Sequence, residues 1–354
     1  MAGEARPSFE FRPGVIVDPN RRLVYAMRPE KGVQAIDVVT GKVVWTSEAG
    51  DKPLGVLRGR LVVQADTPDR SAALRIVILE AGDGTMRSQA EAMLPAEVRP
   101  AIDETPTSSF ATRGWQRAGK VFVSWAFSRR VPSGVDTGMS ATQLHGVVAV
   151  DVATGRVETR EREAHDETVP FSAPVRHAMA AGKIPRAPWR TGTLLTATVR
   201  AHDGGNRTVL ERWRADTGEV LPDVVLFRDE DRWSVRYPSA DGVHLLVSRP
   251  TGNADGSYTW RFFSLETGSH IADVTGSGPG ARFFIADATL VHDVRRSGRL
   301  VGARFIGEQP LSLRGVRLAD GSEVWSQRLR DTTLPTDQQY PPTTGQPTGV
   351  DSPR

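Results

Sequence analysis

The residues of this chain best suited to chemistry are histidines and acids in predicted loops. His165 and His177 lie twelve residues apart, and Asp166 follows the first of them. Imidazole and carboxylate groups are ligands for divalent transition metals, so a metal ion could be held here if Asp103 and Glu104 came close. The plainer interpretation is that all five are solvated polar loop residues. The sequence therefore predicts a candidate binding surface at these positions and no metal site.

Arg129 and Arg130 form a second candidate group for binding. A planar guanidinium can hold a carboxylate or a phosphate through two parallel hydrogen bonds. The alternative is a pair of arginines on a loop surface. His292 and Asp293 lie within a predicted strand with no nucleophile placed beside them, which favours a satisfied polar pair over a catalytic dyad. We assign no catalytic residue and no cofactor from the sequence.

The element that must position these loops is a hairpin at residues 35–45, with the sequence Ala-Ile-Asp-Val-Val-Thr-Gly-Lys-Val-Val-Trp. Two short β-branched runs flank a two-residue turn, Thr40-Gly41, in which the glycine can adopt the positive φ of a tight hairpin. Trp45 brings a large ring that can pack on a neighbouring repeat and donate its N–H there. One hairpin is only marginally stable alone, so its faces must be buried against others.

The same turn recurs five more times, each time after an apolar run. The six turn glycines are spaced 43, 71, 63, 50 and 53 residues apart. A period of roughly 40–50 residues with about four short strands per unit is typical of propeller blades. We expect an all-β chain that forms a single β-propeller of about six four-stranded antiparallel blades, with seven blades as the alternative. The repeat-turn residues are Asp37, Thr40, Gly41, Trp45, Gly84, Thr154, Gly155, Thr217, Gly218, Thr267, Gly268, Asp320, Gly321 and Trp325.

The pattern A-x-D-x-x-T-G-x-x-x-W at residues 35–45 resembles the tryptophan-docking motif of PQQ-like (quinoprotein-type) β-propeller repeats. The last repeat keeps Asp320, Gly321 and Trp325, and the middle repeats keep the turn without the tryptophan. Enzymes of that family bind a quinone and a calcium ion, are exported, typically have eight blades, and often carry a vicinal Cys pair. This chain has no cysteine, about six blades and no assignable ligand set, so the resemblance implies a non-catalytic branch.

The domain boundaries follow from where the repeats stop. Residues 1–13 read as an extended arm, residues 14–330 as the propeller, and residues 331–354 as a disordered Pro/Thr-rich tail. A propeller has to close its ring. We expect Ser8–Val17 to pair beside Val324–Arg328 and so remove the free sheet edges.

Three long predicted loops fall on one face of the blades, because successive strands alternate in direction. They span residues 90–109, 128–144 and 161–188, and they contain the candidate binding residues named above. Long loops in a compact fold often carry function. We expect a protein partner to bind this face.

Composition narrows the possible partners and the compartment. The 45 basic and 42 acidic residues give a formal charge of +3, without the basic runs of a nucleic-acid-binding protein. There is no cysteine, which excludes disulfides and thiolate metal sites. No stretch is long and apolar enough to suggest a membrane helix, and the first residues lack the apolar core of a signal peptide. We expect a cytoplasmic chain, or a periplasmic or extracellular one if an export signal was removed.

The function that the sequence favours is a non-catalytic propeller serving as a protein–protein interaction platform or scaffold in a bacterial assembly. Two alternatives stay open. One is an enzyme, either quinoprotein-like or a lyase or hydrolase, with its site at the mouth of the central channel. The other is a sensor that binds a small ligand in the channel. Perturbed carboxylates or histidines at the channel mouth would favour the enzyme.

Overall fold

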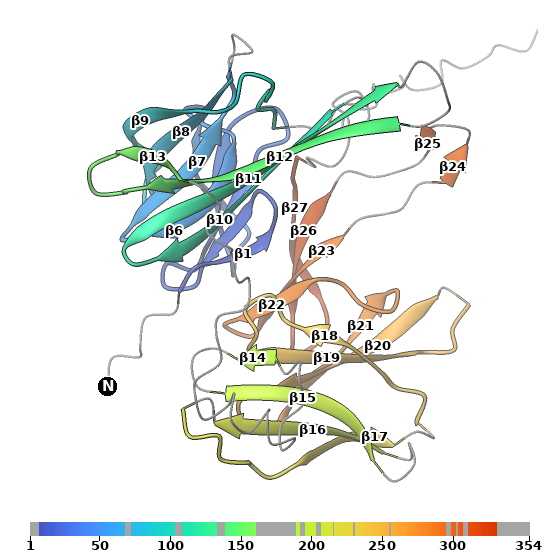
Figure 1. Ribbon diagram of the computed structural model, residues 1–354. Coiled ribbons are helices and arrows are strands. Elements are labelled where there is room, and N and C mark those ends of the chain that lie inside the picture. The colour runs from blue at the N-terminus through green and yellow to red at the C-terminus, as the bar shows by residue number, and fades with distance from the viewer. Residues whose placement is uncertain are drawn as a thin grey trace, which may run out of the picture.

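The fold is known from a computed structural model, and it consists of antiparallel sheets whose strands follow one another along the chain (Figure 1). The structure describes residues 7–67, 72–102, 108–132, 139–160, 189–191, 195–202, 207–214, 216–228, 231–254, 256–294, 299–301, 304–306 and 311–330. These residues form six sheets of at least four strands and one small two-stranded sheet, and they contain no helix. The predicted β-propeller of six blades is confirmed. The predicted tail and the loop at 161–188 lie outside the described residues.

Each blade is a meander of consecutive strands. Blade one comprises β1 (Phe9–Arg12), β2 (Val15–Asp18), β3 (Leu23–Met27), β4 (Val33–Asp37) and β5 (Val43–Ser47). Blade two comprises β6 (Lys52–Leu57), β7 (Arg60–Ala65), β8 (Ala73–Glu80) and β9 (Met86–Met93). Blade three comprises β10 (Ser108–Arg117), β11 (Lys120–Pro132), β12 (Met139–Val150) and β13 (Val157–Arg160).

The second half of the chain repeats the arrangement. Blade four comprises β14 (Trp189–Thr191), β15 (Leu195–His202), β16 (Arg207–Arg214) and β17 (Val224–Arg228). Blade five comprises β18 (Ser234–Pro238), β19 (His244–Pro250), β20 (Ser257–Ser264) and β21 (His270–Ser277). Blade six comprises β22 (Phe283–Ala286), β23 (Thr289–Val294), β26 (Ser312–Arg317) and β27 (Glu323–Arg328). A small hairpin of β24 (Arg299–Val301) and β25 (Arg304–Ile306) is inserted between β23 and β26.

The turn between the third and fourth strands is longer than the two residues predicted, so that prediction is wrong. In blade one the N–H of Gly41 donates to the carbonyl of Asp37 at 2.8 Å, and the N–H of Asp37 donates to the carbonyl of Lys42 at 2.9 Å. The Asp37 carboxylate accepts the N–H groups of Val39 and Thr40 and the Thr40 hydroxyl. The carboxylate satisfies main-chain donors that a four-residue loop leaves free, which explains why an acid begins the motif. All six turn glycines have φ between 67° and 75°.

The tryptophan of one blade lies on the turn glycine of the next. The Trp45 ring covers Gly84, where a Cβ atom would lie 2.5 Å from the ring, and its Nε1–H donates to the Ala81 carbonyl at 3.2 Å. Trp325 of blade six covers Gly41 of blade one in the same way, and its Nε1–H donates to the Val38 carbonyl at 3.0 Å. The second contact joins the two ends of the repeat array.

The turn aspartate of blade six, Asp320, should titrate well below an ordinary carboxyl group. In blade six the Asp320 carboxylate accepts the hydroxyl and N–H of Ser322, at 2.6 and 3.0 Å, and ion-pairs with Arg317 at 3.0 Å. These interactions lower the pKa of Asp320 to about 2. Because the pKa falls on folding, the stabilisation is present above pH 3.8 and is lost as the pH drops through about 2. An NMR titration should give this value, and Ser322→Ala should raise it. An unchanged value in the variant would contradict the assignment.

Five apolar clusters join neighbouring blades. They link blade four to five, five to six, six to one, one to two, and two to three, so the described contacts run as one continuous series around the fold. Within the described parts of the chain, no such cluster joins blade three to blade four. A search of the same residues for helices able to span a membrane found none.

Two further sequence predictions are wrong. The stretch at 128–144 is largely strand, because β11 and β12 continue past the end of β10 as far as the pair Pro132↔Met139. The N-terminal segment does not pair beside Val324–Arg328, since β1 pairs with β2 of its own blade. Side chains, above all Trp325, join blade six to blade one instead.

Candidate functional site

The most unusual feature of the fold is that the N-terminal strand β1 lies at the inner edge of the blades. In blades one to three the first strands of the four-stranded meanders, β2, β6 and β10, lie next to one another. β1 pairs with β2 on its inner side, and its side chains reach blades two, three and six. All four residues of β2 are buried under it. β1 therefore lies beside β2 and between blade one and blades two, three and six.

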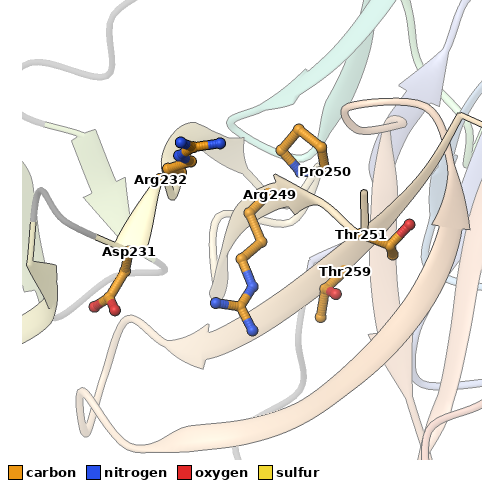
Figure 2. Close-up of a pocket in the computed structure, with 6 residues that line it drawn as sticks. All are labelled: Asp231, Arg232, Arg249, Pro250, Thr251 and Thr259. Atoms are coloured by element: carbon orange, nitrogen blue, oxygen red, sulfur yellow. The ribbon is translucent and has the colours of Figure 1, made fainter. Parts of the chain in front are cut away.

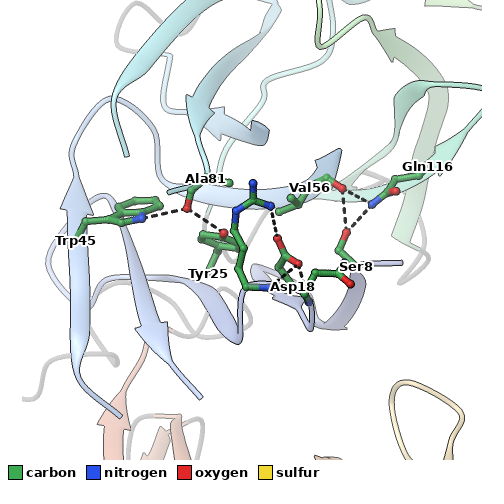
Figure 3. A network of polar contacts seen from close by, with 9 residues as sticks. Ser8, Asp18, Tyr25, Trp45, Val56, Ala81 and Gln116 are labelled. Atoms are coloured by element: carbon green, nitrogen blue, oxygen red, sulfur yellow. Dashed lines mark hydrogen bonds and ion pairs between the residues drawn. The ribbon is translucent and has the colours of Figure 1, made fainter. Parts of the chain in front are cut away.

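Polar contacts fix the start of this strand to blades two and three (Figure 3). The Ser8 hydroxyl donates to the Val56 carbonyl of β6 at 3.0 Å. The Gln116 amide of β10 donates to both the Ser8 hydroxyl and the Val56 carbonyl. A third strand-to-strand contact lies nearby, where Tyr25 of β3 donates its hydroxyl to the Ala81 carbonyl at 2.9 Å. Three different blades are therefore tied together around the first residues of β1.

Aromatic rings and an ion pair fix the rest of the strand to blade six. The rings of Phe9 and Phe11 both meet Phe284 of β22 edge-on, with centroid distances of 5.7 and 5.4 Å. Phe11 is fully buried. Arg12 Nη1 donates to Asp293 Oδ2 of β23 at 2.8 Å, and both side chains are largely shielded from water. Thus Asp293, which the sequence places as a polar partner, pairs with a residue 281 positions away.

Glu10 is the titratable group at the centre. Burial raises the pKa of its carboxyl group, and the nearby cations Arg113, Lys52 and Arg282 oppose that rise. These cations come from β10, from β6 and from the residue before β22. Cations from three blades face this carboxylate and partly offset the cost of its burial. Paired acid–base chemistry would need a second titratable partner close by.

Replacing Glu10 with glutamine should change how stability depends on pH. The pKa of Glu10 is raised on folding, so its contribution to stability is complete below pH 4.5 and declines as the pH rises through the folded value. The difference in unfolding free energy between Glu10→Gln and the wild type should therefore move in favour of the variant as the pH increases from 4 towards 8. Urea unfolding at several pH values would measure it. A difference that shifts in favour of the variant on acidification would contradict the assignment.

A second location is a hollow of about 430 Å³ on blade five (Figure 2). It is lined by Asp231, Arg232, Arg249, Pro250, Thr251 and Thr259. The Arg249 guanidinium lies 4.7 Å from the centre of the buried Trp233 ring, and that of Arg261 lies 4.3 Å from it. Arg261 is held by Asp273 through two hydrogen bonds of 2.8 and 2.7 Å. Arg249 is exposed, so its cation is presented to solvent on an aromatic support.

The sequence-predicted binding residues are mostly outside the described structure. Asp103, Glu104, His165, Asp166 and His177 all lie there. Arg129 is exposed on β11, opposite Ser108 and Thr142, and Arg130 follows it in the same strand. Among the described residues, no three His, Asp or Glu side chains are grouped as a metal site would require.

Sequence analysis missed both locations found here. The alternation of Phe9, Glu10, Phe11 and Arg12 was a usable strand signal, but nothing local to it identifies Phe284 or Asp293 as its neighbours. The hollow on blade five depends on an interstrand stack of Arg249 and Trp233, which are sixteen positions apart. The inserted hairpin of β24 and β25 was also missed.

Comparison with known proteins gives a likeness in fold only. No family model matches the sequence, and no curated protein does. Similar solved structures include the AtxE2 isopeptidase, 14% identical, with a TM-score of 0.41 over 95% of this chain and 56% of that one. A europium-containing methanol dehydrogenase is 11% identical, with a TM-score of 0.25 over 87% and 67% of the two chains.

A third similar structure is the β-propeller domain of the Trilobed protease from Pyrococcus furiosus, 10% identical, with a TM-score of 0.24 over 63% of this chain and 58% of that one. This chain spans little more than half the length of the isopeptidase and of the protease domain. At these identities and scores the likenesses give no guidance on activity.

Proposed function

We propose that this chain is a non-catalytic propeller that acts as a platform for protein–protein contacts. The observation that carries the proposal is the position of β1. The two alternative functions, an enzyme and a ligand sensor, both place their site at the channel and therefore need free space at the centre of the blades. That position holds Phe11, which is fully buried, and Glu10 surrounded by cations from three blades. Side chains that fix β1 in this position contribute to stability, which favours binding on the outer faces.

The partner surface we propose is the face that carries the connections between second and third strands. Because strands alternate, these connections lie on the same face as the links from one blade to the next. Two of them are elaborated, as the extension of β11 and β12 in blade three and as the β24–β25 hairpin in blade six. The hollow on blade five lies between the link from blade four and the connection between β19 and β20. At this hollow the Arg249 guanidinium lies over the Trp233 ring. Exposed Arg supported by Trp is a composition typical of binding hot spots.

A pull-down from native lysate with identification of the captured protein tests this proposal. The wild type would be run beside Arg249→Ala and beside a variant whose residues 130–141 are replaced by a short Gly-Ser link. The matched control is Arg214→Ala, an exposed arginine near the blade-four turn on the opposite face. We expect a stoichiometric partner that is retained by the control and lost or weakened at least about tenfold by the other two, as for a hot spot.

Two outcomes would contradict the proposal. One is that no partner is captured under any condition. The other is that a partner is captured equally by all four proteins, which would move its site away from this face. In either case the centre and the hollow on blade five would be screened for metal, quinone and sugar ligands instead.

A further inference from the structure

We propose that the centre of the propeller is a binding site for an extended peptide strand with the pattern aromatic–acidic–aromatic–basic. The strand Phe9–Arg12 fills the site within its own chain, and the same strand of a second copy of the chain can fill it in exchange. This inference concerns the inner edge of the blades and goes beyond the proposed platform, whose face lies elsewhere.

The strand is held by its pairing with β2 and by contacts to other blades. Its register with β2 consists of three residue pairs interrupted by a bulge, and the bulge falls at Phe11. Its remaining contacts are made to other blades, through the Val56 carbonyl, the Phe284 ring and the Asp293 carboxylate. Part of what holds the strand in place is therefore preformed on blades two and six, in addition to its pairing with β2 and the packing of Phe11 in the cluster that joins blades six and one.

The site selects for charge at two positions. The acidic residue of the strand faces three cations, Lys52, Arg113 and Arg282. Two positions further on, the basic residue meets Asp293 at 2.8 Å. A strand of reversed charge would bring like charges together at both positions, which costs affinity in a partly buried site. The two aromatic positions are fixed by one shared surface, the edge of the Phe284 ring.

The short connection between β1 and β2 favours a second copy of the chain as the source of the bound strand. β1 and β2 are joined only by Pro13 and Gly14, and Gly14 has a φ of 77°. A hinge this short favours exchange of the element it carries, because straightening it releases a tight turn. A second copy offers the same β2 edge, the same ring and the same charges, so the exchanged strand loses none of the contacts made in its own chain.

The test uses the full-length chain and a fluorescein-labelled synthetic peptide of residues 7–13, Pro-Ser-Phe-Glu-Phe-Arg-Pro. Glu10→Lys in the full chain places a fourth cation among three others and should release its own strand. Fluorescence anisotropy should then show saturable binding of the peptide to this variant, at least about tenfold tighter than to the wild type, whose site is filled. A control peptide with lysine in place of the glutamate should bind neither protein. Circular dichroism confirms that the variant is folded.

If Glu10→Lys fails to fold, Phe9→Ala serves in its place, because Phe9 is only partly buried and its loss is milder. The proposal is overturned if a folded variant shows no saturable binding of the peptide, or if the reversed-charge peptide binds as well as the native one. Native mass spectrometry of the concentrated wild type supplies the second arm. An exchanged dimer is expected, and Arg12→Asp should reduce it. Strictly monomeric wild type, before and after warming, would rule out exchange with a second copy.

Discussion

Replacing Trp325 with alanine is expected to lower the free energy of unfolding by about 3–5 kcal/mol, as deletion of a buried large ring does. The ring is 7% exposed, belongs to the cluster that joins blade six to blade one, and lies directly against Gly41. Its loss leaves a cavity between the first and last blades. It also removes the donor that the buried Val38 carbonyl accepts at 3.0 Å.

Urea unfolding followed by circular dichroism measures this effect. Val324→Ala is the matched control, because the neighbouring side chain on the same strand is 40% exposed and its removal should change stability by less than about 0.5 kcal/mol. Equal, small effects of the two substitutions would show that the first and last blades are not held together by this tryptophan. Gly41→Ala should also destabilise, since the residue has a φ of 67° and the new Cβ atom would lie 2.2 Å from the ring.

Replacing Phe11 with alanine is expected to cost about 3–5 kcal/mol as well, because it opens a cavity at the centre of the propeller. The ring is fully buried and meets Phe284 at 5.4 Å with an interplanar angle of 74°. It lies on a strand of only four residues, so few other contacts can compensate for its loss.

The matched control for this prediction is Phe9→Ala. Phe9 contacts the same Phe284 ring from the same strand but stays partly exposed, and its loss should therefore cost clearly less. Urea unfolding of both variants decides the point. If Phe11→Ala costs no more than Phe9→Ala, β1 is a peripheral arm and not a strand packed between blades one and six.

Much of the fold was predictable because the blade signal is local. The turn from Asp37 to Gly41 needs an acid to accept main-chain N–H groups and a glycine for positive φ, and both requirements are visible within five residues. The glycine with positive φ recurs in all six turns, and its repetition gives the number of blades. The long hairpin of β11 and β12 was misjudged because Ser128, Arg129 and Arg130 look like loop residues, although exposed strands tolerate them.

The centre of the molecule was not predictable in the same way. The pattern of residues 8–12 indicates a strand with packed aromatic side chains. Its neighbours in the structure are Val56, Gln116, Phe284 and Asp293, which lie 48 to 281 positions away in the sequence. Which of these are close depends on how the blades are arranged around the axis. The sequence contains no local signal for that arrangement, so the three cations near Glu10, which come from three blades, emerged only from the structure.

The measurement that tests the central claim most directly is the reactivity of a single thiol placed at Phe11. The chain has no cysteine of its own, so Phe11→Cys introduces the only thiol, and Val44→Cys, at a residue 53% exposed, is the reference. Both would be treated with a thiol reagent under native conditions. If β1 fills the centre, the thiol at position 11 reacts only as fast as the protein opens, while that at position 44 reacts at once. Equally fast reaction at both positions in a folded protein would show that the strand lies outside.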